Sequence, residues 1–167
     1  MNLRSSFNYN LNNFFQLRTN LKDLKNFSKK LAAQAIPDDI FLLQGELGSG
    51  KTTFSRFFIE SIFEKYKLKK PHSIKSPTFP ILINYSLKDF EIYHYDFFRL
   101  KNVNEFIELG IFENLKDNIT IIEWPEKIID SNQLKNYYLI KFEIDNINFR
   151  MLKISHTMKK IFFNINE

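Results

Sequence analysis

Apolar residues recur along this chain at two spacings, and each spacing indicates one kind of secondary structure. Spacings of three and four residues, typical of a helix face, occur in the segment 21–35 and again after residue 52, where positions 54, 57, 58 and 62 are apolar. The first helix should begin after Asn20, which has Asp23 three residues further on as in a capping box, and should end before Pro37. The second should end in the lysine-rich run 65–70, which is either a solvated helix end or a nucleic-acid patch.

Short apolar or alternating runs elsewhere have the pattern of strands. The run at 81–85 follows a proline-bracketed loop and should pair with the run at 91–96 across a turn at Asp89, and the two runs near the C-terminus should pair across Asp145 and Asn146. A short helix should lie between these pairs and end at Gly110. The expected strands are at 14–19, 40–43, 81–85, 91–96, 118–123, 136–145, 148–155 and 160–164, and the short helix is at 104–109.

The connection between the strand at 40–43 and the second helix carries the strongest chemical signal. It reads Gly45-Glu46-Leu47-Gly48-Ser49-Gly50-Lys51-Thr52-Thr53, which satisfies G-x-x-x-x-G-K-[ST] and contains three of the four glycines in the chain. In such a phosphate-binding loop the backbone N–H groups face phosphate oxygens. Lys51 would reach the β- and γ-phosphates, and the Thr52 hydroxyl would hold Mg²⁺. The sequence therefore predicts a site for a nucleoside triphosphate, in which Lys51 should be solvated when no ligand is bound.

Strand, loop, helix and further strands in this order predict an α/β fold. We expect the three-layer arrangement of phosphate-loop NTPases, with helices on both sides of a mixed sheet that has a parallel core. The segments 81–96 and 136–155 are too short for crossover helices, so they should add antiparallel hairpins. The length of 167 residues suits one domain, and we expect 1–13 and 156–167 to lie at its periphery.

Two carboxylates follow predicted strands and are candidates for work on the phosphates. Glu123 ends a buried strand, as a second Mg²⁺ ligand should, and Asp96 ends another. If both strands run parallel to the first, both acids lie at the edge of the sheet where ligands bind. One could hold the metal while the other orients or deprotonates water. Each could instead be an ordinary turn or capping acid.

Four other residues each allow two interpretations of their role. Thr78 could serve a nucleotide-sensing switch or a plain turn before a strand, and Arg99 could offset developing negative charge or pair with Glu105 or Glu108. His94, on a strand, is more typical of a core imidazole than of a base. Trp124, the single tryptophan, could stack on the base or pack over the loop.

Composition limits which classes of function and site the chain can have. The net charge is +5, but the excess lies in lysine, and the abundance of Lys, Asn, Ile and Phe is typical of an AT-rich coding background; direct RNA binding is therefore left open. With no cysteine there is no disulfide, thiolate nucleophile or cysteine-type zinc site. Neither a membrane span nor a signal peptide is apparent, so we expect a cytoplasmic protein.

The motifs together resemble one small family. The loop at 45–53, Ser76-Pro77-Thr78-Phe79, His94-Tyr95-Asp96-Phe97-Phe98-Arg99-Leu100, Glu108-Leu109-Gly110 and Ile122-Glu123-Trp124-Pro125-Glu126 are similar in order and spacing to the TsaE (YjeE) ATPases of bacterial tRNA threonylcarbamoyladenosine synthesis. The resemblance spans about residues 14 to 155. Phe98 departs from it, since the family usually has Tyr there.

The resemblance implies an activity that the motifs alone do not. Family members resemble weak ATPases whose nucleotide cycle resets a complex of TsaD and TsaB proteins, which transfers the threonylcarbamoyl group to tRNA. By this likeness ATP and Mg²⁺ are the cofactors, Lys51 and Thr52 serve phosphate and metal, and Glu123 completes the metal site. Asp96 and Thr78 belong to the catalytic or switch region, and Trp124 lies near the nucleotide. The implied partners are TsaD-like and TsaB-like proteins, with tRNA reached through the complex.

Two other functions are compatible with the same phosphate-binding loop. A small phosphate-loop kinase would phosphorylate a metabolite or nucleotide, although such enzymes typically carry an arginine-rich lid and this chain has five arginines, none clustered after residue 99. A binding module would use ATP only to gate assembly.

Overall fold

The computed structural model describes residues 14–130 and 134–157, and the described strands form one seven-stranded sheet. The strands are β1 (Phe15–Thr19), β2 (Ile40–Gly45), β3 (Leu82–Ser86), β4 (Glu91–Asp96), β5 (Ile119–Glu123), β6 (Tyr138–Ile144) and β7 (Arg150–His156). The helices are α1 (Leu21–Gln34), α2 (Lys51–Lys65), α3 (Val103–Glu108), α4 (Ile111–Asn114) and α5 (Glu126–Asp130). Across the sheet the strands lie in the order β1-β7-β6-β2-β5-β4-β3.

The sheet is parallel at its centre and antiparallel at both sides. β2 pairs in parallel with β5 and β6, and β5 pairs in parallel with β4. The hairpins β3–β4 and β6–β7 are antiparallel, and β1 adds antiparallel to β7. The predicted α/β fold with a parallel core and antiparallel hairpins is confirmed.

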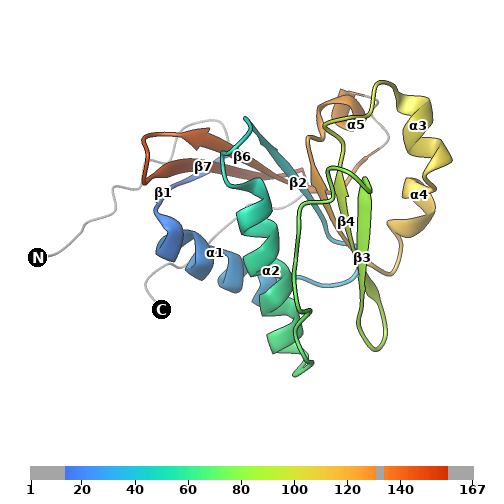
Figure 1. The fold of residues 1–167 in the computed structure, drawn as a ribbon, viewed down its shortest axis with the longest axis horizontal. Helices are drawn as coiled ribbons and strands as arrows, with labels where there is room; N and C mark the ends of the chain where they lie inside the picture. The colour runs from blue at the N-terminus through green and yellow to red at the C-terminus, as the bar shows by residue number, and fades with distance from the viewer. Residues whose placement is uncertain (1–13, 131–133, 158–167) are drawn as a thin grey trace, which may run out of the picture.

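Helices cover the two faces of the sheet unequally (Figure 1). α1 and α2 pack beside each other on one face, where Leu31 and Phe58 are buried against Phe41 and Leu43 of β2. The short helices α3, α4 and α5 belong to a second core on the other face, over β2, β4 and β5. The three predicted layers are present, and they leave the carboxyl ends of β2, β4 and β5 at one edge.

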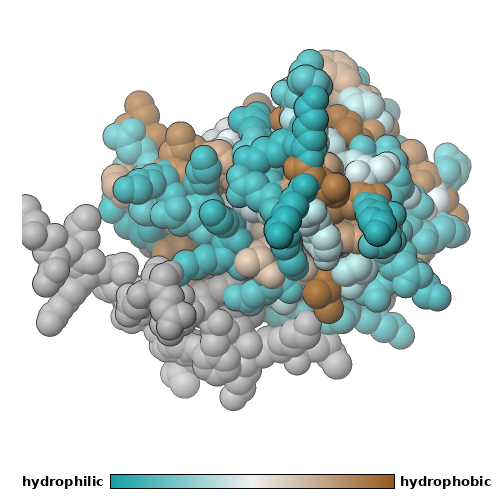
Figure 2. Space-filling model, turned by 90° about the horizontal axis from the view of Figure 1, so that it is seen from below, coloured by the Kyte–Doolittle hydropathy of each residue, from teal (hydrophilic) through white to brown (hydrophobic). Residues whose placement is uncertain are grey.

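Local signals account for the first helix. The Asn20 side chain accepts a hydrogen bond from the Asp23 N–H at 3.0 Å, and the Asp23 carboxylate accepts one from the Asn20 N–H at 3.4 Å, so the predicted capping box is present. Seen from below the view of Figure 1, hydrophilic side chains cover much of the described surface, with some hydrophobic side chains between them (Figure 2). Among the described residues, none of the helices has the length and apolar character needed to cross a membrane.

The sequence pattern missed two short helices. α4 follows Gly110, which ends the preceding helix and adopts φ 61°, and α5 follows Pro125. With four and five residues, neither is long enough to show a helical period. The strand expected at 160–164 lies outside the described residues.

Candidate functional site

A cavity of about 220 Å³ opens at the carboxyl edge of the parallel strands. Five segments meet there: the loop after β2, the start of α2, the segment before β3, the end of β4 and the end of β5. The lining residues are Leu47, Gly48, Gly50, Lys51, Thr52, Thr53, Ser76, Thr78, Asp96, Phe98, Glu123 and Trp124. The cavity thus brings together most of the residues that the sequence singled out, across 78 positions of the chain.

The loop at 45–52 has the backbone of a tight turn that only glycine allows at its start. Gly45 has φ 150°, and a Cβ atom there would lie 2.5 Å from the Phe142 carbonyl oxygen and 2.8 Å from Ser49 Oγ. Gly50 has φ 109° immediately before α2. Of the loop residues predicted to bind nucleotide, Gly45, Glu46 and Ser49 do not line this cavity.

Lys51 is buried, which corrects the expectation of a solvated side chain. It is 4% exposed, and its Nζ donates to the carbonyl oxygens of Gly45 at 2.6 Å and Glu46 at 2.9 Å. The ammonium also lies 3.9 Å from the centre of the Trp124 ring, a cation–π contact. Desolvation by burial lowers the pKa of Lys51, although the carboxylates of Glu123 and Asp96 oppose that shift. Lys51 is folded back onto its own loop.

Glu123 is held by hydrogen bonds to both of its oxygens. Oε2 accepts from the Thr52 hydroxyl at 2.9 Å, and Oε1 accepts from the Ser55 hydroxyl at 3.3 Å. His94 Nε2 lies 2.8 Å from the same Oε1, and both side chains are almost fully buried. His94 is buried and does not line the cavity, so it holds the carboxylate from within the protein, which agrees with the interpretation of this imidazole as a core residue.

Asp96 lies beside Glu123, because β4 and β5 are in parallel register at these two residues. Its Oδ2 accepts from the Thr78 hydroxyl at 2.6 Å and from the Ser76 hydroxyl at 3.1 Å, while Oδ1 accepts from the Phe98 N–H at 3.0 Å. The carboxylate thus ties the Ser76-Pro77-Thr78 segment to the end of β4. Both predicted acids lie at the edge of the sheet where ligands bind.

Trp124 has an unusual backbone that turns its ring over the loop. It has φ 59°, a left-handed conformation that is an outlier for a bulky residue and costs on the order of 1–3 kcal/mol. Its backbone N–H donates to the Leu43 carbonyl oxygen at 3.1 Å, and the centre of its ring lies 4.9 Å from the centre of the Phe98 ring. The ring of Phe98, where the resembling family has Tyr, therefore packs against the indole.

Arg99 does not enter the cavity. Its guanidinium lies 5.3 Å from the centre of the Phe79 ring, and Arg99 is absent from the salt bridges found in 14–130 and 134–157, which leaves the predicted pairing with Glu105 or Glu108 without support. Glu105 instead accepts from the Lys101 N–H and the Asn102 side chain. The alternative role of Arg99, offsetting developing negative charge, stays a prediction.

Three side chains at the site were not predicted. Ser55 lies one helical turn after Lys51 and so shares its face of α2, a signal that the sequence offers. Ser76 belongs to the segment that contains the predicted switch residue Thr78, but its own hydrogen bond to Asp96 was not predicted. Arg150 contacts the loop from a strand about a hundred residues away, and no local pattern reveals that contact.

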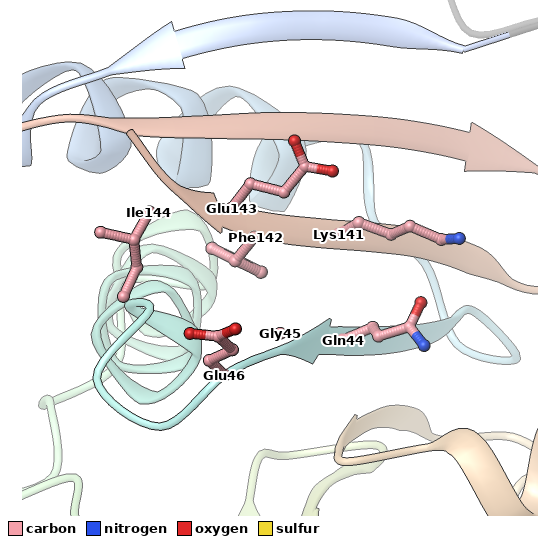
Figure 3. Close-up of a pocket in the computed structure, with 7 residues that line it drawn as sticks. All are labelled: Gln44, Gly45, Glu46, Lys141, Phe142, Glu143 and Ile144. Carbon is pink, nitrogen blue, oxygen red and sulfur yellow. The ribbon is translucent and has the colours of Figure 1, made fainter. Parts of the chain in front are cut away.

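A second hollow lies behind the loop, between the end of β2 and β6. Its volume is about 370 Å³, and its lining residues are Gln44, Gly45, Glu46, Lys141, Phe142, Glu143 and Ile144. Figure 3 shows Ile144, at the end of β6, beside the phosphate loop at Glu46. The end of β6 is therefore a neighbour of the loop.

Comparisons with known proteins agree with this geometry. The family model described as "Threonylcarbamoyl adenosine biosynthesis protein TsaE" matches residues 18–152. The tRNA threonylcarbamoyladenosine biosynthesis protein TsaE of Rickettsia typhi is 46% identical over 107 residues, which are 64% of this chain and 71% of that protein. The protein of the same name from Borreliella burgdorferi is 31% identical over 125 residues, 74% of this chain and 86% of its own.

A solved structure has the same fold. The crystal structure of YdiB from Bacillus subtilis superposes with a TM-score of 0.62 and 24% identity, and the match covers 84% of each chain. The family model spans most of the chain and includes every residue that lines the cavity. The chain belongs to the TsaE family of threonylcarbamoyladenosine biosynthesis proteins.

Proposed function

We propose that this protein binds ATP with Mg²⁺ and hydrolyses it slowly, and that TsaD-like and TsaB-like partners accelerate the hydrolysis. The nucleotide cycle would support the turnover of those partners in modifying tRNA, in the cytoplasm, and this chain would reach tRNA through the complex. We take residues 1–167 as a single ATPase domain. The family membership supports the pathway, and the phosphate loop supports the nucleotide.

One observation carries the proposal. The Thr52 hydroxyl and the Glu123 carboxylate are hydrogen-bonded at 2.9 Å, at the mouth of a glycine loop that also holds Lys51. A hydroxyl and a carboxylate supply the oxygen ligands that Mg²⁺ prefers, and Mg²⁺ in such sites is completed by substrate phosphates and water. Thr52 and Glu123 therefore fit a metal ion, which would neutralise charge on the β- and γ-phosphates.

The other residues of the cavity suit the remaining tasks. The loop N–H groups and the start of α2 would bind the phosphates, and Lys51 would turn from its loop carbonyls to the β- and γ-phosphates. Asp96 would orient or deprotonate the attacking water, and Thr78 would couple that carboxylate to the Ser76-Pro77-Thr78 segment. Trp124, packed against Phe98, would border the nucleotide.

Slow hydrolysis by the isolated chain follows from the cations at the site. Lys51 is the only cationic side chain among the residues that line the cavity in the described part of the chain, and Arg99 lies over Phe79 outside it. A missing arginine finger can lower a phosphoryl-transfer rate by about 10³–10⁵. A partner protein would have to supply the missing stabilisation.

The rim of the cavity suits a protein partner. Leu47 and Phe98 line the cavity and are 79% and 54% exposed, and Phe79, which follows the lining residue Thr78 in sequence, is 84% exposed. Exposed apolar side chains that gather around a site are typical of protein contacts. This supports docking of the partner over the nucleotide.

Steady-state phosphate release tests the proposal. The chain alone should release phosphate slowly, the TsaD–TsaB-type complex should accelerate release, and Thr78→Ala should blunt that acceleration. Fast release by the chain alone, or no stimulation, would contradict partner gating. Transfer of labelled γ-phosphate to a metabolite or nucleotide instead of water would favour the kinase reading.

A further inference from the structure

Arg150, the first residue of β7, joins two segments that are far apart in sequence. Its Nε donates to the Ser49 carbonyl oxygen at 3.1 Å, and its Nη2 donates to the Gly48 carbonyl oxygen at 3.3 Å. Its Nη1 donates to the carbonyl oxygens of Asn146 at 2.8 Å and Phe149 at 3.0 Å, in the turn between β6 and β7. One guanidinium therefore bridges the phosphate loop and this turn.

The direction of these bonds matters for phosphate binding. The C=O of Ser49 and the N–H of Gly50 belong to one planar trans peptide unit and point in opposite directions. Fixing the Ser49 carbonyl toward Arg150 therefore aims the Gly50 N–H the other way, and Gly50 lines the cavity. Arg150 thus sets the orientation of the Gly50 N–H although it makes no contact with that group.

Lys51 and Arg150 divide the carbonyl oxygens of the loop between them. Lys51 holds Gly45 and Glu46, and Arg150 holds Gly48 and Ser49. Lys51 must leave its carbonyls to reach a phosphate, whereas Arg150, bonded on the side away from the phosphates, can stay. The contacts of Arg150 with Gly48 and Ser49 can therefore persist both with and without bound phosphate.

The turn between β6 and β7, which accepts the hydrogen bonds of Arg150 Nη1, is itself anchored to the sheet. Arg18 at the end of β1 bonds Asp145 at 2.8 Å and lies 3.9 Å from the centre of the Phe149 ring. Arg150 is paired with Thr19 in the β1–β7 register. Arg150 therefore links the loop to a fixed point of the fold.

We propose that Arg150 is a positioning residue that holds the phosphate loop in its binding shape from outside, before and after Lys51 turns to the phosphates. The inference rests on the proposed nucleotide function and deepens it. A guanidinium suits this role because its planar fork reaches two successive carbonyl oxygens on one side and two on the other, which a lysine ammonium cannot do.

Calorimetric titration with inorganic tripolyphosphate and with ATP tests the inference, because tripolyphosphate reports on the loop without the nucleoside. Arg150→Ala should weaken both ligands by about tenfold, which is about 1.4 kcal/mol. Arg150→Lys, which keeps the charge but not the fork, should recover only part of that loss. Arg18→Ala is the matched control: it removes one positive charge and two contacts from the same turn, which the β6–β7 pairing and the Arg150 bonds still hold, and it should leave both affinities within about twofold.

Unfolding midpoints of all variants establish that the titrated protein is folded. Wild-type affinity in Arg150→Ala would overturn the inference, and so would full recovery in Arg150→Lys, which would leave charge alone as the cause. Equal losses in Arg150→Ala and Arg18→Ala would also overturn it, since the turn and not the loop contact would then be responsible. Failure of the wild-type chain to bind ATP would instead overturn the proposed function on which the inference rests.

Discussion

Replacing Lys51 by alanine removes the one cationic side chain that lines the cavity among residues 14–130 and 134–157, and it should weaken ATP binding strongly. In the structure the Lys51 ammonium donates to the carbonyl oxygens of Gly45 and Glu46 and contacts the Trp124 ring. Phosphate oxygens would replace these partners when ATP binds. The variant loses the phosphate contacts but also avoids the cost of breaking the contacts within the loop.

The size of the effect follows from that difference. A hydrogen bond to a charged group contributes about 1.5–3 kcal/mol, and the free protein already has two such bonds at Lys51. Negatively charged phosphates hold an ammonium better than neutral carbonyls do. We therefore expect a loss of tenfold to a hundredfold in ATP affinity, which is about 1.4–2.8 kcal/mol.

Calorimetry with Mg²⁺ and ATP measures this loss, and Lys65→Ala is the matched control. Lys65 also donates to a backbone carbonyl oxygen, that of Ala35 at 2.7 Å, but it lies at the far end of α2. Its removal should leave ATP affinity unchanged. Equal ATP affinity in wild-type protein and Lys51→Ala would refute the assignment of the phosphate loop.

Three further expectations follow from other contacts at the site. Asp96→Asn should leave ATP affinity within about twofold and lower partner-stimulated phosphate release by about a hundredfold, as for loss of a general base; a parallel loss of ATP affinity would contradict a role confined to turnover. ATP should change the fluorescence of Trp124, the single tryptophan, because Lys51 leaves its ring, and the same titration of Lys51→Met should show a smaller change at saturating ATP. Burial raises the pKa of Tyr95 above its ordinary value of 10.0, so the folded state keeps a proton that the unfolded state loses, and stability should fall as pH rises past that value. Tyr95→Phe should reduce this alkaline loss in denaturant unfolding, and an unchanged pH profile would show that Tyr95 does not cause it.

Local sequence signals were sufficient wherever one segment determines its own structure. The capping residues Asn20 and Asp23 set the start of α1, and the alternation at 91–96 gave β4 with its observed bounds. The phosphate loop is recognisable because its glycine spacing is a local requirement of the backbone. The two acids could be placed at one edge because parallel strands end together, as the Asp96 and Glu123 register shows.

Features that depend on contacts between distant segments could not be predicted from local sequence patterns. The burial of Lys51 depends on the left-handed backbone of Trp124, which turns the indole over the ammonium. The contact of Arg150 with Ser49 joins residues 101 positions apart, and a single arginine at the start of a strand carries no pattern. Such side chains acquire partners only when the sheet brings β7 beside the loop.

The magnesium dependence of ATP binding tests the central claim most directly, because that claim rests on the hydrogen bond between Thr52 and Glu123. ATP affinity is measured by calorimetry with Mg²⁺ and with a chelator, in wild-type protein and in Glu123→Gln, which keeps the shape of the side chain and removes its charge. We predict that Mg²⁺ tightens ATP binding to the wild-type protein, and that Glu123→Gln loses most of this gain while its affinity in chelator stays close to wild type. An equal gain from Mg²⁺ in both proteins would contradict the assignment of Glu123 as a ligand of the metal.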